Sequence, residues 1–138
     1  MGLLQPGDTV LAPQVKALVA DGAVILVFFK INCPVCQMTL PYFERLHPAM
    51  RIYGVSQNDD EDTRHFAKRF GVTFPMLRDR EEDDFPLSNE FGITHVPATF
   101  FVEPGGRISR VIEGWNRREM EALGALRETD NVPAWKAG

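Results

Sequence analysis

The stretch VILVFFKINCPVCQMTLPYF, residues 24–43, contains the two features that decide the fold. Its first six residues are a continuous run of β-branched, aromatic and other apolar side chains. A short run of this kind predicts a strand buried on both faces, the type found in parallel sheets covered by helices. Cys33 and Cys36 follow the run at once and open a helical pattern. The sequence therefore predicts a dithiol at a strand-to-helix turn.

Strands and helices alternate on both sides of this stretch. A chain of 138 residues fits one domain, here residues 1–138, with 129–138 expected as a tail. Alternation followed by a hairpin predicts an α/β fold with a central mixed β-sheet flanked by helices. The expected helices are 13–20, 33–47, 59–70, 86–91 and 116–128, and the expected strands are 24–29, 51–56, 73–77, 98–102 and 107–113.

Charge and hydropathy narrow the classes of partner. The net charge of −4 disfavours a broad phosphate-binding face, so no nucleic acid is expected. The longest apolar run, residues 23–29, is far shorter than the roughly 20 residues of a membrane helix, so no membrane span is expected in this chain. The first residues have no basic start and no apolar leader. This predicts a cytoplasmic protein as given, or an exported one if a leader has been removed.

The spacing of the two cysteines points to redox chemistry. A disulfide across Pro34 and Val35 closes too short a loop to stabilise the fold much. The N-terminus of a helix stabilises a thiolate through free backbone N–H groups and aligned peptide dipoles, so Cys33 is expected to be the nucleophile. Pro34 suits the first helical position. Cys36, one turn further in, is expected to be more buried and harder to ionise, and to resolve the mixed disulfide formed by Cys33.

With these residues the chain resembles the thioredoxin-like superfamily over roughly residues 20–128. Pro41 stands where these proteins carry a helix-kinking proline, and Gly114 matches a further family glycine. The segment 91–99 resembles the one that ends in the cis-proline of the family, which places Pro97 against the dithiol. The resemblance implies that the backbone of Val96, beside a cis Pro97, pairs with an extended substrate peptide.

Residues 55–91 resemble the strand-helix insert before the cis-proline that distinguishes the thiol:disulfide interchange branch, which includes TlpA-like proteins and related redoxins. Two residues depart from the pattern of the family. Asn32 stands where a Trp usually precedes the first Cys, and Val27 stands where plain thioredoxins have a buried acidic proton carrier. Lys30, Glu113 or water could carry the proton of Cys36 instead.

The preferred interpretation is a thiol:disulfide oxidoreductase that needs no cofactor and no metal. Its partners would be protein thiol or disulfide substrates and a second dithiol protein, and a monomer is expected. Its catalytic residues would be Cys33 and Cys36, and residues 32, 34 and 35 would complete the active-site loop. A zinc site lacks ligands, because there is no second cysteine pair.

Two alternatives remain open. One is a peroxiredoxin-type thiol peroxidase, although Lys30 occupies the position where that class needs Thr or Ser. The other is a redox-sensing or chaperone-like binding module that uses the same groove without turnover.

Overall fold

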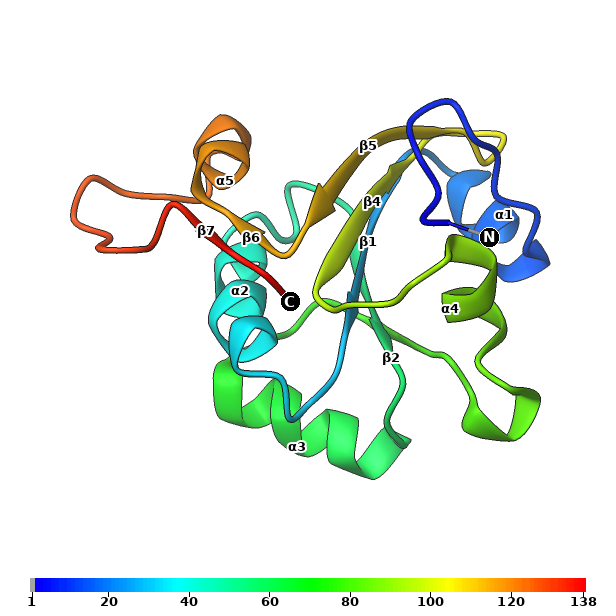
Figure 1. Ribbon diagram of the computed structural model, residues 1–138, viewed down its shortest axis with the longest axis horizontal. Coiled ribbons are helices and arrows are strands. Elements are labelled where there is room, and N and C mark those ends of the chain that lie inside the picture. Colours follow the sequence, from blue (N-terminus) through cyan, green and yellow to red (C-terminus); the bar gives the residue numbers. More distant parts are fainter. Residues whose placement is uncertain (1) are drawn as a thin grey trace.

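The computed structural model describes residues 2–138 and shows a five-stranded sheet between two layers of helices (Figure 1). The helices are α1 (Pro13–Val19), α2 (Pro34–Glu44), α3 (Asp60–Phe70), α4 (Pro86–Phe91) and α5 (Arg117–Leu123), with a 3-10 turn, η1, at Glu81–Asp83. The strands are β1 (Val24–Phe29), β2 (Ile52–Ser56), β3 (Met76–Arg78), β4 (Ala98–Val102), β5 (Ile108–Glu113), β6 (Trp115–Asn116) and β7 (Trp135–Lys136).

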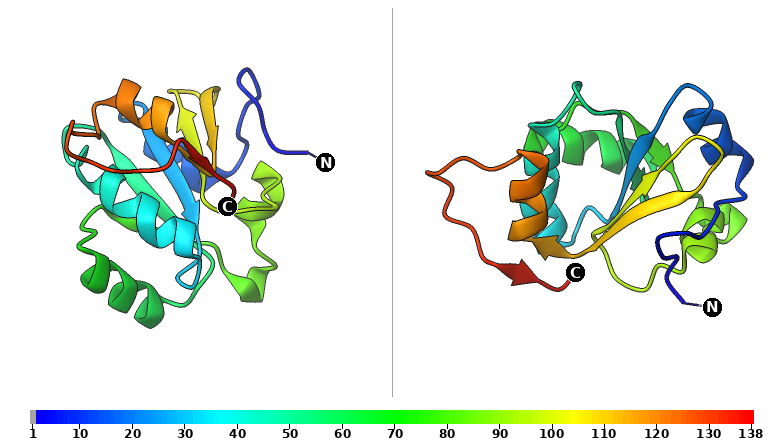
Figure 2. Two further views of the ribbon diagram at one scale, coloured as in Figure 1. Left: turned by 60° about the vertical axis from the view of Figure 1, so that its left-hand side comes forward. Right: turned by 90° about the horizontal axis from the view of Figure 1, so that it is seen from above.

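The sheet is mixed, as predicted, with the order β3-β2-β1-β4-β5. Strands β1, β2 and β3 run parallel, while β4 pairs antiparallel with both β1 and β5. Helices α2 and α3 cover one face, and α1 and α4 cover the other (Figure 2). Strand β1 is the central strand and the dithiol follows it directly, so the dithiol lies at one end of the sheet.

Strand β1 is buried along its whole length, which confirms the expectation of a strand covered on both faces. Its last two residues point to opposite layers. The ring of Phe28 lies 4.9 Å from that of Phe91 in α4 and 5.6 Å from that of Phe100 in β4. The ring of Phe29 lies 5.1 Å from that of Phe66 in α3. Neighbouring strand residues alternate faces, so each aromatic ring packs into a separate helix layer.

A buried carboxylate attaches α4 to the edge of the sheet. Asp79 follows β3 and is fully buried, and its two oxygens accept hydrogen bonds from the amides of Leu87 and Ser88 at 2.9 and 2.8 Å. Its own amide donates to the carbonyl of Ser56 at 2.7 Å. The first N–H groups of a helix have no partner within the helix, so Asp79 supplies what the short α4 lacks. The loop that leads from α4 to Pro97 therefore starts from a fixed point.

Three expected elements differ from the observed ones. Helix α2 ends at Glu44 and not at residue 47, because the amides of the next three residues donate to carbonyls three residues back. Helix α5 ends at Leu123 and not near residue 128, because Gly124 adopts a left-handed conformation with φ of 82° and closes the helix. The strand expected over 73–77 is shifted to 76–78. The amides of Thr73 and Phe74 donate instead to the carboxylate of Glu44 at the end of α2, at 2.8 and 3.2 Å.

Residues 133–138, here called the strap, fold back onto the body of the protein. Within the strap, β7 pairs antiparallel with β6, with Trp115 opposite Lys136. The indole N–H of Trp115 donates to the carbonyl of Pro133 at 2.7 Å, and the indole itself is fully buried. The strap ends beside the lower end of β4, at the point marked C in Figure 1.

Candidate active site

Helix α2 begins at the dithiol. Cys33 is the residue before its first turn, with an extended backbone, and Pro34 occupies the first helical position. The amide of Cys36 donates to the sulfur of Cys33 at 3.2 Å, so this sulfur takes the place of a capping side chain. Cys33 is half-buried, Cys36 is buried, and both are free thiols. The predicted arrangement, an outer thiol at a helix start and an inner one beneath it, is confirmed.

Two side chains that sequence analysis did not single out hold the loop before Cys33. The side-chain oxygen of Asn58 accepts from the amide of Ile31 at 3.1 Å, and the side chain of Gln37 donates to the carbonyl of Ile31 at 3.0 Å. Asn58 precedes an acidic helix start, and nothing in its neighbourhood in the sequence indicates a contact 27 residues away. Together these bonds fix the turn from β1 into α2.

The inner thiol is hard to ionise. Burial raises the pKa of Cys36, because an ionised sulfur would lose its hydration, and the hydrogen bond with Cys33 raises it further. The backbone and the charge of Lys30 oppose these effects in part. Cys36 therefore remains a thiol until a group nearby takes its proton.

Pro97 lies against the dithiol, as expected. The Val96–Pro97 peptide bond is cis, and the thiol of Cys33 donates to the carbonyl oxygen of Val96 with a sulfur–oxygen distance of 3.5 Å. Val96 is only 8% exposed, so its backbone is less open than the resemblance implies. A second cis bond, His47–Pro48, lies beyond the end of α2 and has no counterpart in the sequence-based expectations.

The remaining residues of the expected active-site loop lie at the surface around the dithiol. Asn32 and Pro34 are exposed, and Val35 is half-buried against the core. The exposure of the residues on both sides of Cys33 places the dithiol at the surface of the protein.

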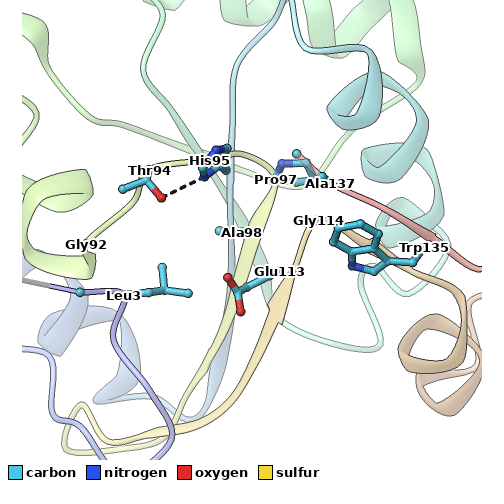
Figure 3. Close-up of a pocket in the computed structure, with 12 residues that line it drawn as sticks. Leu3, Gly92, Thr94, His95, Pro97, Ala98, Glu113, Gly114, Trp135 and Ala137 are labelled. Carbon is cyan, nitrogen blue, oxygen red and sulfur yellow. Dashed lines mark hydrogen bonds between the residues drawn. The ribbon is translucent and has the colours of Figure 1, made fainter.

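A cavity of about 340 Å³ lies beside Pro97 (Figure 3). Pro97 and Ala98 line one side, the carboxylate of Glu113 points into it, and the indole of Trp135 in the strap forms another wall. His95 also lines the cavity, is exposed, and shares a hydrogen bond of 3.0 Å with the hydroxyl of Thr94. The cavity is thus bounded both by the cis-proline loop and by the strap.

The sheet register bears on the candidate proton carriers of Cys36. Glu113 pairs with Ala98, whereas Val27 pairs with Thr99 one residue further along β4. Side chains alternate faces along a strand, so Glu113 lies on the opposite face from Val27 and Thr99. Thr99 has a buried hydroxyl without a hydrogen-bond partner in the described part of the chain. Of the two candidate side chains, Lys30 and Glu113, only Lys30 lowers the pKa of Cys36.

Residues 2–138 hold neither a ready-made metal site nor a membrane-spanning helix. No group of three or more His, Cys, Asp or Glu side chains is placed to hold a metal ion. No helix within this range combines the length and the apolar character needed to cross a membrane.

Comparison with known proteins places the chain in a family. The model of the AhpC/TSA family matches residues 10–111. The chain belongs to this family. A curated relative, the thiol-disulfide oxidoreductase ResA of Geobacillus thermodenitrificans, is 31% identical over 102 residues, which are 70% of this chain and 57% of ResA. The chain therefore spans little more than half the length of that relative.

Solved structures show that this AhpC/TSA member has a thioredoxin-like fold. A putative thiol:disulfide interchange protein DsbE from Chlorobium tepidum superposes with a TM-score of 0.72 at 16% identity, covering 88% of this chain and 94% of that one. The peroxidoxin BcpB from Mycobacterium tuberculosis superposes with a TM-score of 0.71 at 20% identity, covering 93% and 99%. Both kinds of protein share the fold, so the fold does not choose between their activities.

Proposed function

We propose that this protein is a thiol:disulfide oxidoreductase that exchanges disulfides with protein substrates through Cys33 and Cys36. The observation that carries the proposal is the unequal pair at the start of α2. One sulfur is half-exposed and accepts a helix amide, while the other is buried with a raised pKa. Disulfide exchange needs one thiol that reaches a substrate and one that waits behind it.

The reduction of a substrate disulfide then takes two steps. The thiolate of Cys33 attacks one substrate sulfur, forms a mixed disulfide and releases the other substrate sulfur as a thiolate, which takes up a proton. Cys36 next loses its proton and attacks the Cys33 sulfur, which releases the remaining substrate thiolate. The substrate disulfide gains two electrons, and Cys33 and Cys36 lose them to form a disulfide.

The fold contributes position and local charge to these steps. The amide of Cys36 already donates to the Cys33 sulfur, and this bond is stronger to a thiolate than to a thiol. The carbonyl of Val96 directs the Cys33 thiol toward the cis-proline loop, where Val96 and Pro97 are proposed to shape the substrate groove. A second dithiol protein would return the electrons. The same steps run in reverse when the substrate arrives as a dithiol.

A thiol peroxidase is the second candidate, favoured by the family model and by the peroxidoxin neighbour. The site supports it less well. Lys30 stands three residues before Cys33, where the peroxidase class needs a hydroxyl to bind peroxide. In this structure the amide of Cys33 donates to the backbone carbonyl of Lys30 at 3.3 Å.

Insulin reduction by dithiothreitol, measured in parallel with peroxide consumption, tests the proposal. The protein should accelerate insulin reduction and leave peroxide at the uncatalysed rate. Cys33→Ser should reduce the insulin rate to background, because no thiol can start the exchange. Cys36→Ser should accumulate a mixed disulfide that mass spectrometry detects.

Three other outcomes would contradict the proposal. Peroxide consumption without insulin reduction identifies a peroxidase. Activity in neither assay, with substrate peptides still bound, identifies a binding module. If Cys36→Ser retained the full insulin rate, the role of Cys36 as resolving thiol would be wrong.

A further inference from the structure

The strap crosses the surface next to the dithiol and lies in the groove between the cis-proline loop and Gly114. Figure 3 shows Ala137 beside Pro97 and Trp135 beside Gly114. The pairing of β6 with β7 continues the chain toward Val96. The surface where a substrate strand would approach Cys33 is thus already occupied by residues 135–138.

Two glycines measure how tightly the strap fits. A Cβ added at Gly114 would overlap the carbonyl oxygen of Lys136 and lie 3.3 Å from the amide nitrogen of Gly138. A Cβ added at Gly138 would overlap the carbonyl oxygen of Val96 and lie 2.9 Å from the nitrogen of Pro97. Only the absence of a side chain at both positions allows this approach.

The carbonyl oxygen of Val96 is the point where the strap and the dithiol meet. It accepts the hydrogen bond from Cys33 at 3.5 Å, and Gly138 lies against the same oxygen. An extended peptide that pairs with the backbone of Val96 needs the space that Gly138 fills.

The strap is held in a way that permits its release. Its ladder consists of two residue pairs, and Trp135 within it is 58% exposed. Outside the ladder, the carbonyls of Ala134 and Pro133 accept from the Arg117 amide and the Trp115 indole, at 2.9 and 2.7 Å. Isolated two-stranded pairing is marginal in water, so residues 135–138 can detach while the contacts of Trp115 remain.

We propose that residues 135–138 are an internal competitor that occupies the substrate groove and must be displaced before a polypeptide substrate reaches Cys33. This inference rests on the proposed function for the identity of the groove. It also describes the preferred substrate: an extended segment with a small residue where it passes the Val96 carbonyl. The apparent affinity for a substrate is then the affinity of the open state multiplied by the fraction of molecules in which the groove is open.

A variant that ends at Ala134 tests the inference without disturbing the Trp115 contact. The rate of Cys33 alkylation by iodoacetamide should rise by the inverse of the fraction of molecules in which the groove is open in the intact protein. In the insulin assay the KM should fall by a similar factor with kcat unchanged. Alkylation needs no turnover, so it reports on the strap even if the proposed function fails.

Gly138→Val in the chain of 138 residues is the second variant, because its Cβ cannot coexist with the Val96 carbonyl. It should raise the alkylation rate in the same direction and speed hydrogen exchange at the Lys136 amide. Leu11→Ala is the control, since that side chain is 70% exposed and does not line the cavity. Circular dichroism verifies that each variant is folded. If the truncated protein and Gly138→Val, both folded, alkylate at the wild-type rate, the strap does not guard Cys33 and the inference is wrong.

Discussion

The turn from β1 into α2 and the strap meet at the Val96 carbonyl, yet they are held by different means. The turn stands on a strand buried along its whole length and on a helix of eleven residues. The strap relies on a two-residue ladder and a half-exposed indole. Burial contributes far more free energy than a short exposed ladder. The proposed chemistry therefore stands on the rigid region, and the proposed control of access to it depends on the weakly held one.

Removal of a core ring from β1 should produce the largest effect on stability. Phe28→Ala deletes a ring that packs on Phe91 and Phe100 and should lower the free energy of unfolding by about 3 to 5 kcal/mol. Urea denaturation measures it. Leu11→Ala, which removes a side chain that is 70% exposed, is the control and should stay within about 0.5 kcal/mol. Equal losses in both variants would mean that β1 is not the rigid region.

The link between the two regions is the indole of Trp115. Trp115→Phe keeps an aromatic ring beside Tyr42 but removes the donor to Pro133. Loss of this partly buried hydrogen bond should cost about 1 kcal/mol. Hydrogen exchange should rise at Lys136 and remain slow in β1. Loss of protection in β1 as well would show that the strap and the core unfold together, which contradicts the comparison.

Removal of the buried Thr99 hydroxyl in β4 should raise the free energy of unfolding, whereas the two preceding changes lower it. Thr99 pairs with Val27, and its hydroxyl has no partner in the described residues. Thr99→Val should therefore stabilise the protein by about 1 kcal/mol in urea denaturation. Insulin turnover should not change, because Cys36 would not depend on this hydroxyl for its proton. A slower second step in the variant would instead identify Thr99 as a positioning residue for Cys36.

The smallest effect is expected at the ion pair that anchors the loop before the strap. The hydrogen bond from Arg45, followed by the amide of Arg127, lowers the pKa of Asp130. A carboxylate with a lowered pKa adds stability above its ordinary pKa of about 3.9, and this stability is lost as pH falls through the lowered value. Asp130→Asn should therefore reduce stability at pH 7 and flatten its acid dependence, measured as urea midpoints between neutral and acidic pH. Identical pH profiles would show that the pair is unimportant.

The predictable parts are those that local sequence decides. The apolar run of β1 and Pro34 after Cys33 each specify their element within a few residues, and the structure has both where expected. The cis bond at Pro97 required the resemblance to a known family, because no neighbouring residue determines it. Both thiols lie as predicted, and their catalytic roles remain proposals.

The parts that were not predicted depend on contacts between distant residues. The amides of Thr73 and Phe74 donate to the carboxylate of Glu44, so they are not available for the expected strand. Trp135 and Lys136 form a strand only because β6 lies 20 residues earlier, and their own sequence has no strand pattern. Asn58 reaches the turn before Cys33 in the same way. Spacing along the chain contains no information about such pairs.

The buried carboxylate of Asp79 has a consequence for damage far from the sulfurs. It anchors the first turn of α4, and the chain passes from there through one loop to Pro97. This loop is fastened to the sheet at each end, by Asp79 and by β4. Loss of this carboxylate would free the end of the loop that starts at α4 and would shift Pro97, so the proposed activity would fall with both sulfurs intact.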